Sequence, residues 1–78
     1  MTPDQCRVLA DTPPFVRFGE PPHRIAKRSG IALTTCRVIL EHVLLPLDYV
    51  SRSYIDRSYL WSRTPLGDTV AGRASHGR

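Results

Sequence analysis

The sequence has few of the residues that small proteins use to hold metal ions or disulfide bonds. Only two of its 78 residues are cysteines, Cys6 and Cys36, and they form no CxxC pair. Zinc sites and disulfide frameworks depend on closely spaced ligands or on several cysteines, so neither is indicated. We therefore expect two reduced thiols that act as small core residues, and no bound metal ion or other cofactor.

Long apolar runs are also missing. No stretch has the roughly 20 consecutive apolar residues that a membrane-spanning helix needs. The first residues, Met1 to Gln5, lack the apolar run of a signal peptide. These absences predict a cytoplasmic protein without a membrane partner.

Residues at the spacing of a catalytic site are missing as well. His23, His42 and His76 lie far apart, and none has a partner at a spacing that would build a shared site. Cys36 and His42 are six residues apart, which places them on different faces of a helix, unlike the i, i+4 spacing of paired helical ligands. A chain this short also rarely encloses a deep pocket. We expect a protein that is not an enzyme.

Acidic residues are outnumbered by basic ones. Eleven Lys and Arg residues against seven Asp and Glu residues give a formal net charge of +4, and Lys27 is the only lysine. The planar guanidinium of arginine binds phosphate and guanine edges in a bidentate way that lysine does not match. The composition suits either a nucleic-acid partner or a basic solvated surface, and the positions of the arginines must decide between them.

Proline, threonine and glycine divide the first part of the chain into helices. Thr2 and Pro3 combine an N-cap with a proline at the first helical position, and Pro13 and Pro14 end this helix. A second helix is predicted over residues 22–29, with Gly30 at the turn where a positive φ is needed. The third and longest helix is predicted over residues 33–45. Its apolar side is expected to contain Leu33, Cys36, Ile39, Leu40, Val43 and Leu44.

The remaining segments predict extended structure and one last helix. Residues 15–18 favour a brief strand, and residues 48–54 and 59–64 predict a hairpin with residues 55–58 at its tip. If the hairpin centre is Asp56-Arg57, Arg52 lies opposite Trp61 and can cover its indole face. The Tyr and Trp side chains of the hairpin are expected to seal its underside against the core rather than to stack on RNA bases. A short helix begins at Thr64-Pro65.

The stretch from Arg24 to Ile39 resembles a bacterial helix-turn-helix. Ala26 is the small residue where the two helices cross, and Gly30 follows four positions later in the turn. A larger side chain at Ala26 would force the helices apart, and a Cβ at Gly30 would strain the turn. Apolar residues recur after the turn, as the motif requires, at Ile31, Cys36 and Ile39.

Residues 59–67 are similar to the end of the wing in MarR-like winged-helix repressors, where an aromatic residue precedes a Leu-Thr-x-x-Gly pattern. Trp61, Thr64 and Gly67 match; Arg63 stands where Leu is usual, and Ala32 stands where a capping Ser is usual. The two resemblances imply an α+β, mainly α fold, a winged helix-turn-helix with a three-helix core and a two-stranded β-hairpin wing. We expect one domain over residues 1–72 and a flexible tail over residues 73–78.

The resemblance also implies a function: a small bacterial or phage transcriptional regulator or repressor that binds double-stranded DNA in a sequence-specific way. The helix over residues 33–45 would enter the major groove, and the hairpin would reach the flanking backbone or minor groove. The candidate base-contacting residues are Thr34, Thr35, Arg37 and Val38. The candidate phosphate-binding residues are Arg24, Lys27 and Arg28 in the preceding helix and Arg52, Arg57 and Arg63 in the wing.

The third helix leaves an alternative open. Its side opposite the apolar residues is expected to hold Thr34, Val38, Glu41 and Leu45, and Glu41 would be repelled by phosphate. Val38 and Leu45, exposed together, would form a patch for a second copy of the chain in a dimer or for another protein. The alternative function is therefore a winged-helix protein–protein interaction module, such as a small phage-type protein that docks on a host factor.

Overall fold

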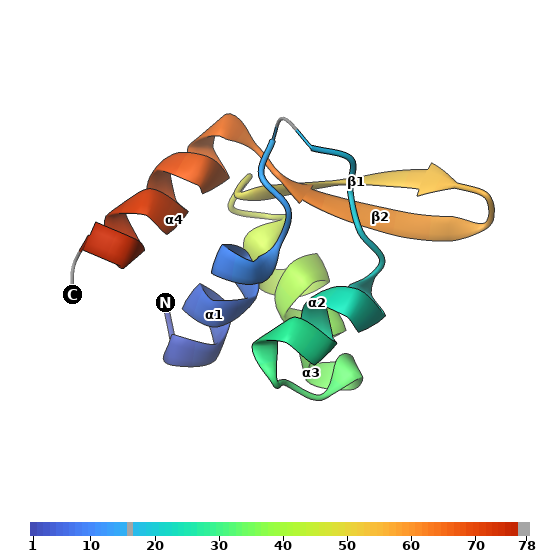
Figure 1. The fold of residues 1–78 in the computed structure, drawn as a ribbon, viewed down its shortest axis with the longest axis horizontal. Helices are drawn as coiled ribbons and strands as arrows, with labels where there is room; N and C mark the ends of the chain where they lie inside the picture. Colours follow the sequence, from blue (N-terminus) through green and yellow to red (C-terminus); the bar gives the residue numbers. More distant parts are fainter. Residues whose placement is uncertain (16, 77–78) are drawn as a thin grey trace.

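Helices fill the first part of the chain, and a hairpin and a last helix follow, in a computed structural model that describes residues 1–15 and 17–76. Figure 1 shows α1, α2 and α3 gathered together, with the hairpin projecting past them on one side and α4 on the other. This arrangement confirms the predicted winged helix-turn-helix fold, mainly α with a two-stranded wing. The elements in chain order are α1 (Pro3–Asp11), α2 (Pro22–Ser29), α3 (Leu33–Val38), the π-helical η1 (Ile39–Leu44), β1 (Val50–Ile55), β2 (Ser58–Arg63) and α4 (Pro65–His76).

The helix ends follow the local sequence signals. The Thr2 hydroxyl accepts a hydrogen bond from the Gln5 backbone, and the Gln5 side chain accepts one from the Thr2 backbone, which completes a capping box. At the start of α4, the Thr64 hydroxyl accepts the Gly67 backbone N–H at 3.0 Å. Gly30 ends α2 with a φ of 69°, a left-handed conformation that glycine adopts without strain.

The predicted third helix is present, but its second half is π-helical. The Leu45 N–H donates to the carbonyl of Leu40, five residues back, at 3.0 Å. Because a π-turn contains more residues than an α-turn, side chains after Val38 are rotated relative to their α-helical positions. Leu45 consequently packs against the core, so the expectation that it lies exposed beside Val38 is wrong. Leu33, expected in the core, is 43% exposed because it lies in the first turn of α3, at the edge of the helical body.

The wing has the register that the sequence predicts for a two-residue tip. β1 and β2 are antiparallel, with Arg52 opposite Trp61 and Ile55 opposite Ser58. Asp56 and Arg57 form the tip with φ values of 51° and 64°, the left-handed conformations that the common hairpin turn with two central residues requires. The hairpin therefore closes without an Asn-Gly sequence, at the cost of placing an arginine in a conformation that few side chains favour.

No strand forms at the place expected between α1 and α2. Phe15 lies in a turn, Arg17 in a bend, and Phe18 in irregular chain; the fourth residue of that stretch, Val16, lies outside the described residues. The Arg17 N–H donates to the carbonyl of Pro14 at 3.0 Å, which turns the chain back on itself. The sheet-like pairing occurs later instead, where Glu20 forms an isolated antiparallel bridge with Trp61.

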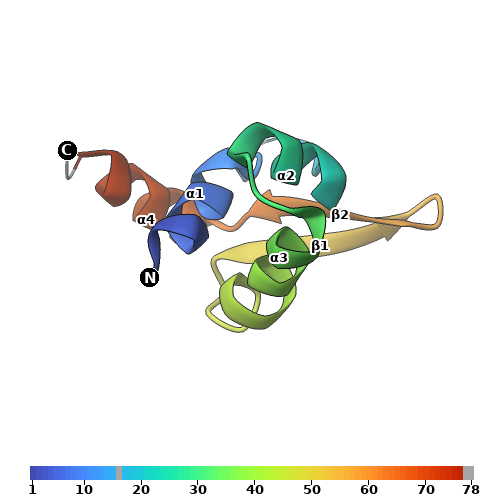
Figure 2. The same cartoon turned by 90° about the horizontal axis from the view of Figure 1, so that it is seen from below.

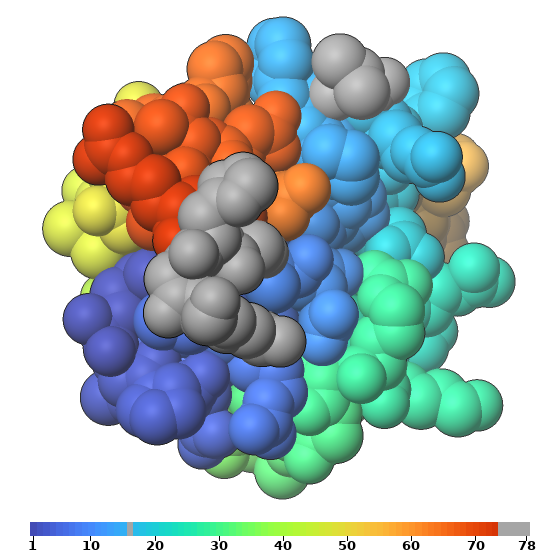
Figure 3. All heavy atoms as spheres, turned by 60° about the vertical axis from the view of Figure 1, so that its left-hand side comes forward, coloured from blue at the N-terminus to red at the C-terminus, as the bar shows by residue number. Residues whose placement is uncertain are grey.

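The core lies between the helices and the inner face of the wing. Trp61 is the largest fully buried side chain, and it closes the core from β2. Figure 3 shows the face formed by α1, α2 and α4, where α4 packs on α1. The buried apolar residues are Val8, Leu9, Ile25, Ala26, Cys36, Ile39, Leu40, Leu44, Val50, Trp61 and Ala71.

The last helix meets the wing at a very close backbone approach. A Cβ at Gly67 would overlap the carbonyl oxygen of Tyr49, so only glycine fits there. This contact gives a physical reason for the Gly of the Trp-x-x-Thr-x-x-Gly pattern. α4 runs to His76, past the expected domain end at residue 72, and residues 77–78 of the expected tail lie outside the described residues.

Candidate nucleic-acid interface

α3 contains one buried residue. Cys36 is fully buried, whereas Thr34, Thr35, Arg37 and Val38 are all exposed. The Cys36 thiol packs against the start of α2, and its sulfur lies 3.9 Å from the carbonyl oxygen of Pro22. All four side chains that the sequence predicts as base contacts therefore face solvent from one rigid helix.

The turn before α3 fixes how the two helices cross. Ala26 is buried at 4% exposure in the crossing, and the Ile31 N–H donates to its carbonyl at 3.1 Å. This is the geometry expected from a small residue at the crossing and a glycine in the turn. Ala32 stands at the N-cap of α3 without a side-chain hydrogen bond, as expected from the missing serine.

A groove of about 270 Å³ separates α3 from the wing. Its walls include His23 at the start of α2, Arg37 on α3, Glu41 on η1, and Arg57 and Tyr59 on the wing. A second hollow of about 260 Å³, lined by Leu33, Thr34, Arg37, Val38 and Glu41, lies on the exposed side of α3. Arg37 borders both hollows, so its guanidinium can serve either one. Figure 2 views α3 and the wing together from below.

The three candidate cations of α2 differ in what surrounds them. Arg24 and Lys27 are exposed. Arg28 instead forms an ion pair with Glu20, in which Nη1 donates to Oε2 at 3.1 Å, and it also donates to the backbone carbonyl of Asp11 at 2.6 Å. The hydrogen bond from Arg28 holds the pKa of the Glu20 carboxyl below its usual range. Arg28 thus connects the end of α1 to the segment before α2.

The three wing arginines also differ. The Arg52 guanidinium lies 4.9 Å from the Tyr59 ring centroid and 5.9 Å from that of Trp61, which confirms the predicted stack on Trp61 and adds a second ring. Arg63 donates from Nε to Asp68 at 2.9 Å and from Nη1 to the carbonyl of Ala10 at 3.4 Å. Arg57 is exposed at the tip. The arginine that replaces the usual leucine at position 63 therefore ties the wing to α4 and α1.

Sequence reasoning missed the exposure of the outer wing. Tyr54 is 62% exposed, Ile55 51% and Tyr59 43%, whereas Trp61 on the same face as the tyrosines is fully buried. The expectation that the Tyr and Trp side chains of the hairpin seal its underside against the core is right for Trp61 and wrong for Tyr54 and Tyr59. The length of the strands was the available signal, because six-residue strands extend beyond the helices that cover their base.

The thiols and histidines build no recognisable reactive site in the described part of the chain. Both cysteines are unpaired, and burial raises the pKa of the Cys36 thiol, which favours its unreactive protonated form. Among the side chains that the structure describes, in residues 1–15 and 17–73, no three His, Cys, Asp or Glu groups gather as a metal site requires. No helix in the same residues is long and apolar enough to cross a membrane.

The fold and the exposed helix place the chain in the class of winged helix-turn-helix domains. The chain is similar to a solved structure of ZitR from Lactococcus lactis, a zinc-responsive MarR family member, with a TM-score of 0.75 and 25% sequence identity. The matched region covers 99% of this chain and 54% of the ZitR chain. The structure of a ZitR mutant matches with the same TM-score and 21% identity, over 97% of this chain and 51% of the mutant chain. No protein-family model and no curated protein matches the chain. The structural likeness confirms the predicted MarR-like winged helix, and the chain spans about half the length of the structures it matches.

Proposed function

We propose that this chain binds double-stranded DNA in a sequence-specific way as a small transcriptional regulator or repressor in the cytoplasm of a bacterium, and that it is not an enzyme. The observation that carries the proposal is the exposed face of α3. Five of its six residues are exposed, among them the four candidates Thr34, Thr35, Arg37 and Val38. Of these four, Arg37 lines the groove between α3 and the wing. A helix flanked by a hairpin is the arrangement that winged helices use to contact the major groove and the neighbouring backbone together.

The residue types on α3 suit readout of base edges. Arg37 can bind O6 and N7 of guanine through two N–H groups, and Val38 can contact a thymine methyl. Thr34 and Thr35 can each bond a base or a phosphate. Arg24 and Lys27 on α2 and Arg57 on the wing tip are the exposed candidates for phosphate.

Arg28, Arg52 and Arg63 take a secondary place in the proposal. Each guanidinium already contacts a carboxylate or an aromatic ring of this chain. Arginine has five N–H donors, so these side chains keep donors for a phosphate, but a phosphate contact would compete with the contacts that they already make.

The decisive experiment is a salt-titrated binding assay on random duplex DNA, followed by selection of the preferred site. Binding through several phosphates makes the logarithm of the affinity fall linearly with the logarithm of salt concentration. We expect such a slope for the wild-type chain and a tighter affinity for selected sequences. Absence of any salt-dependent affinity for any duplex would exclude the proposal.

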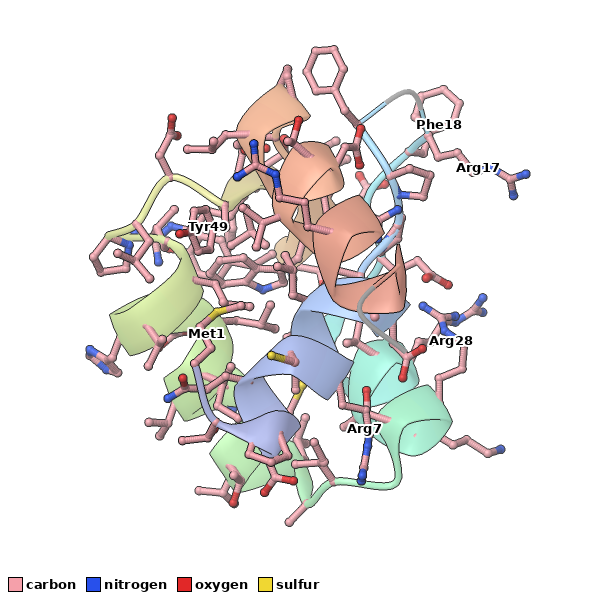
Figure 4. The ribbon with its side chains drawn as sticks, turned by 90° about the vertical axis from the view of Figure 1, so that its left-hand side faces the viewer. Met1, Arg7, Arg17, Phe18, Arg28 and Tyr49 are labelled. Carbon is pink, nitrogen blue, oxygen red and sulfur yellow. The ribbon has the colours of Figure 1, made fainter. Side chains whose placement is uncertain are left out.

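A second candidate function, docking on another protein, is favoured by one observation on the opposite side of the molecule. Phe18 is 95% exposed and Phe15 56% exposed, and Phe18 borders a groove of about 630 Å³. Figure 4 shows Arg17 and Phe18 projecting outward from their loop. Apolar side chains that are exposed together, rather than singly, mark contact sites, and two phenylalanines three residues apart in one loop can form such a patch.

The two candidate functions are separated by charged substitutions. Phe18→Asp would abolish the biological effect without changing DNA affinity if protein docking is the function. Val38→Asp would abolish DNA affinity if α3 reads DNA. Protein docking would replace DNA binding as the proposed function if two results were found together. The wild-type chain would show no affinity for duplex DNA, and Phe18→Asp would abolish the biological effect.

A further inference from the structure

The outer half of the wing exposes more apolar surface than its fold requires. Val50 and Trp61 are buried at its base, whereas Tyr54, Ile55 and Tyr59 are 62%, 51% and 43% exposed. Figure 1 shows the tip of the hairpin extending well past the helices. These three side chains therefore contribute little to the core, and their exposure in water needs another explanation.

The two tyrosines form one ordered surface. Tyr54 and Tyr59 are directly opposite each other in the register, with ring centroids 5.0 Å apart and planes tilted by 56°. The Arg52 guanidinium covers Tyr59 from the side of the wing base. The rings are thus held in place by cross-strand and cation–π contacts before any partner binds, which lowers the entropy lost on binding.

This aromatic surface is continuous with the candidate DNA interface. Strand alternation puts Tyr54 and Tyr59 on the same face of the wing as Trp61. Tyr59 lines the groove of about 270 Å³ together with Arg37 of α3 and Arg57 of the tip. A DNA strand that follows this groove away from α3 would meet Tyr59 first and Tyr54 next.

The wing offers little uncommitted positive charge for a purely electrostatic contact. Arg63 is paired with Asp68, and Arg52 lies over two aromatic rings. Arg57 at the tip adjoins the carboxylate-bearing Asp56 in sequence. The chemistry of the wing is therefore dominated by its aromatic rings.

We propose that Tyr54 and Tyr59 form an apolar contact surface that packs against the sugar and base edges of the DNA minor groove. This inference rests on the proposed function and assigns a partner to the outer wing. Apolar side chains are used in this way by proteins that bind the minor groove, and aromatic rings contact nucleic acid with little dependence on sequence. The part of the affinity that comes from these two tyrosines is then largely independent of salt.

The test compares single substitutions in a salt titration on one duplex that contains the preferred site. Tyr54→Ala should weaken binding about tenfold at every salt concentration between about 50 and 200 mM, with an unchanged salt slope. Tyr54→Phe keeps the ring and should retain most of the affinity. Arg57→Ala should instead reduce the salt slope by about one phosphate contact.

Ile55→Ala is the matched control, because Ile55 is the neighbour of Tyr54 in β1 and is also exposed but lies on the opposite face of the wing. It should leave the affinity unchanged. Thermal unfolding of each variant shows whether the hairpin is intact, and Tyr59→Ala provides a second variant on the same face if Tyr54→Ala unfolds.

Three results would overturn the inference while leaving the proposed function standing. In the first, the wild-type chain would bind duplex DNA and the Tyr54→Ala and Tyr59→Ala variants would bind it equally well. In the second, Tyr54→Phe would lose as much affinity as Tyr54→Ala, which would assign the contact to the hydroxyl. In the third, Ile55→Ala would lose as much affinity as Tyr54→Ala. If the wild-type chain itself binds no duplex, the proposed function fails and the inference fails with it.

Discussion

The arginines on the two sides of this molecule are used differently. Around the loop between α1 and α2 and the base of the wing, Arg28 and Arg63 donate to carboxylates and to carbonyl groups near the end of α1. On the α3 side, Arg37 and Arg57 are exposed beside a groove. The net charge of +4 therefore does not measure the charge available to a partner, because part of it holds the fold together.

The largest expected effect lies at the wing base on the structural side. Gly67→Ala should destabilise the fold by about 3 kcal/mol or prevent folding, because the added Cβ overlaps the Tyr49 carbonyl oxygen. The measurement is chemical or thermal unfolding. Gly72→Ala in the same helix is the matched control: among the described residues, no contact within 4 Å awaits a Cβ at this position, so the substitution should stabilise α4 by about 0.5–1 kcal/mol. Equal stability of the two variants would contradict the close approach.

The second effect is on binding rather than on stability. Arg37→Ala should weaken binding to the preferred site by about 1–3 kcal/mol and relax the sequence preference, if this side chain reads a base. Its thermal unfolding should match that of the wild type, because Arg37 is exposed. A uniform loss on all sequences would instead assign Arg37 to phosphate.

The third effect is on stability, and it is expected for an arginine that the fold already uses. Arg63→Ala should lower the free energy of unfolding by about 1–2 kcal/mol, because the Arg63 side chain is only 17% exposed and binds Asp68 and the end of α1. Arg57→Ala, at the exposed tip, should change stability by less than about 0.5 kcal/mol. If Arg57→Ala proved the more destabilising, the division between structural and available arginines would not hold.

The sequence predicted the parts of the fold that depend on local chemistry. The N-cap at Thr2, the left-handed turn at Gly30 and the stack of Arg52 on Trp61 all follow from residue type and spacing, and the structure contains them. The MarR-like pattern around Trp61 located the wing base correctly. For the candidate site, the same reasoning identified the exposed residues of α3, although their contact with DNA stays a prediction.

The parts that were missed depend on contacts between distant segments. The π-helical turn that moves Leu45 onto the core is set by packing, and no local pattern marks it. The partners of Arg63 include Ala10, 53 residues away in sequence, so its structural role was invisible beside its charge. Residue type shows that position 63 carries a positive charge. It does not show that the guanidinium already binds groups of the same chain.

The smallest expected effect tests the ion pair of the structural side through pH. The Arg28 hydrogen bond lowers the pKa of Glu20 from its ordinary value of 4.5, so the folded state favours the ionised carboxylate. The pair therefore contributes stability above pH 4.5, and this contribution disappears as the pH falls through the lowered folded-state pKa. Both side chains are partly exposed, so the contribution at neutral pH should be below about 1 kcal/mol.

Unfolding of the wild type and of Glu20→Gln, measured from about pH 7 down to about pH 3, checks this expectation. The difference in unfolding free energy should be largest at neutral pH and should shrink toward acid. In an Arg28→Ala background the same Glu20→Gln substitution should have little effect at any pH, because the partner that lowers the pKa has been removed. A difference that persists unchanged at pH 3, or survives without Arg28, would show that Glu20 stabilises the chain through packing beside Trp61 and not through its charge. In that case the hydrogen bond to the Asp11 carbonyl would be the remaining structural contact of Arg28, and among ion pairs the contrast between the two sides of the molecule would rest on Arg63.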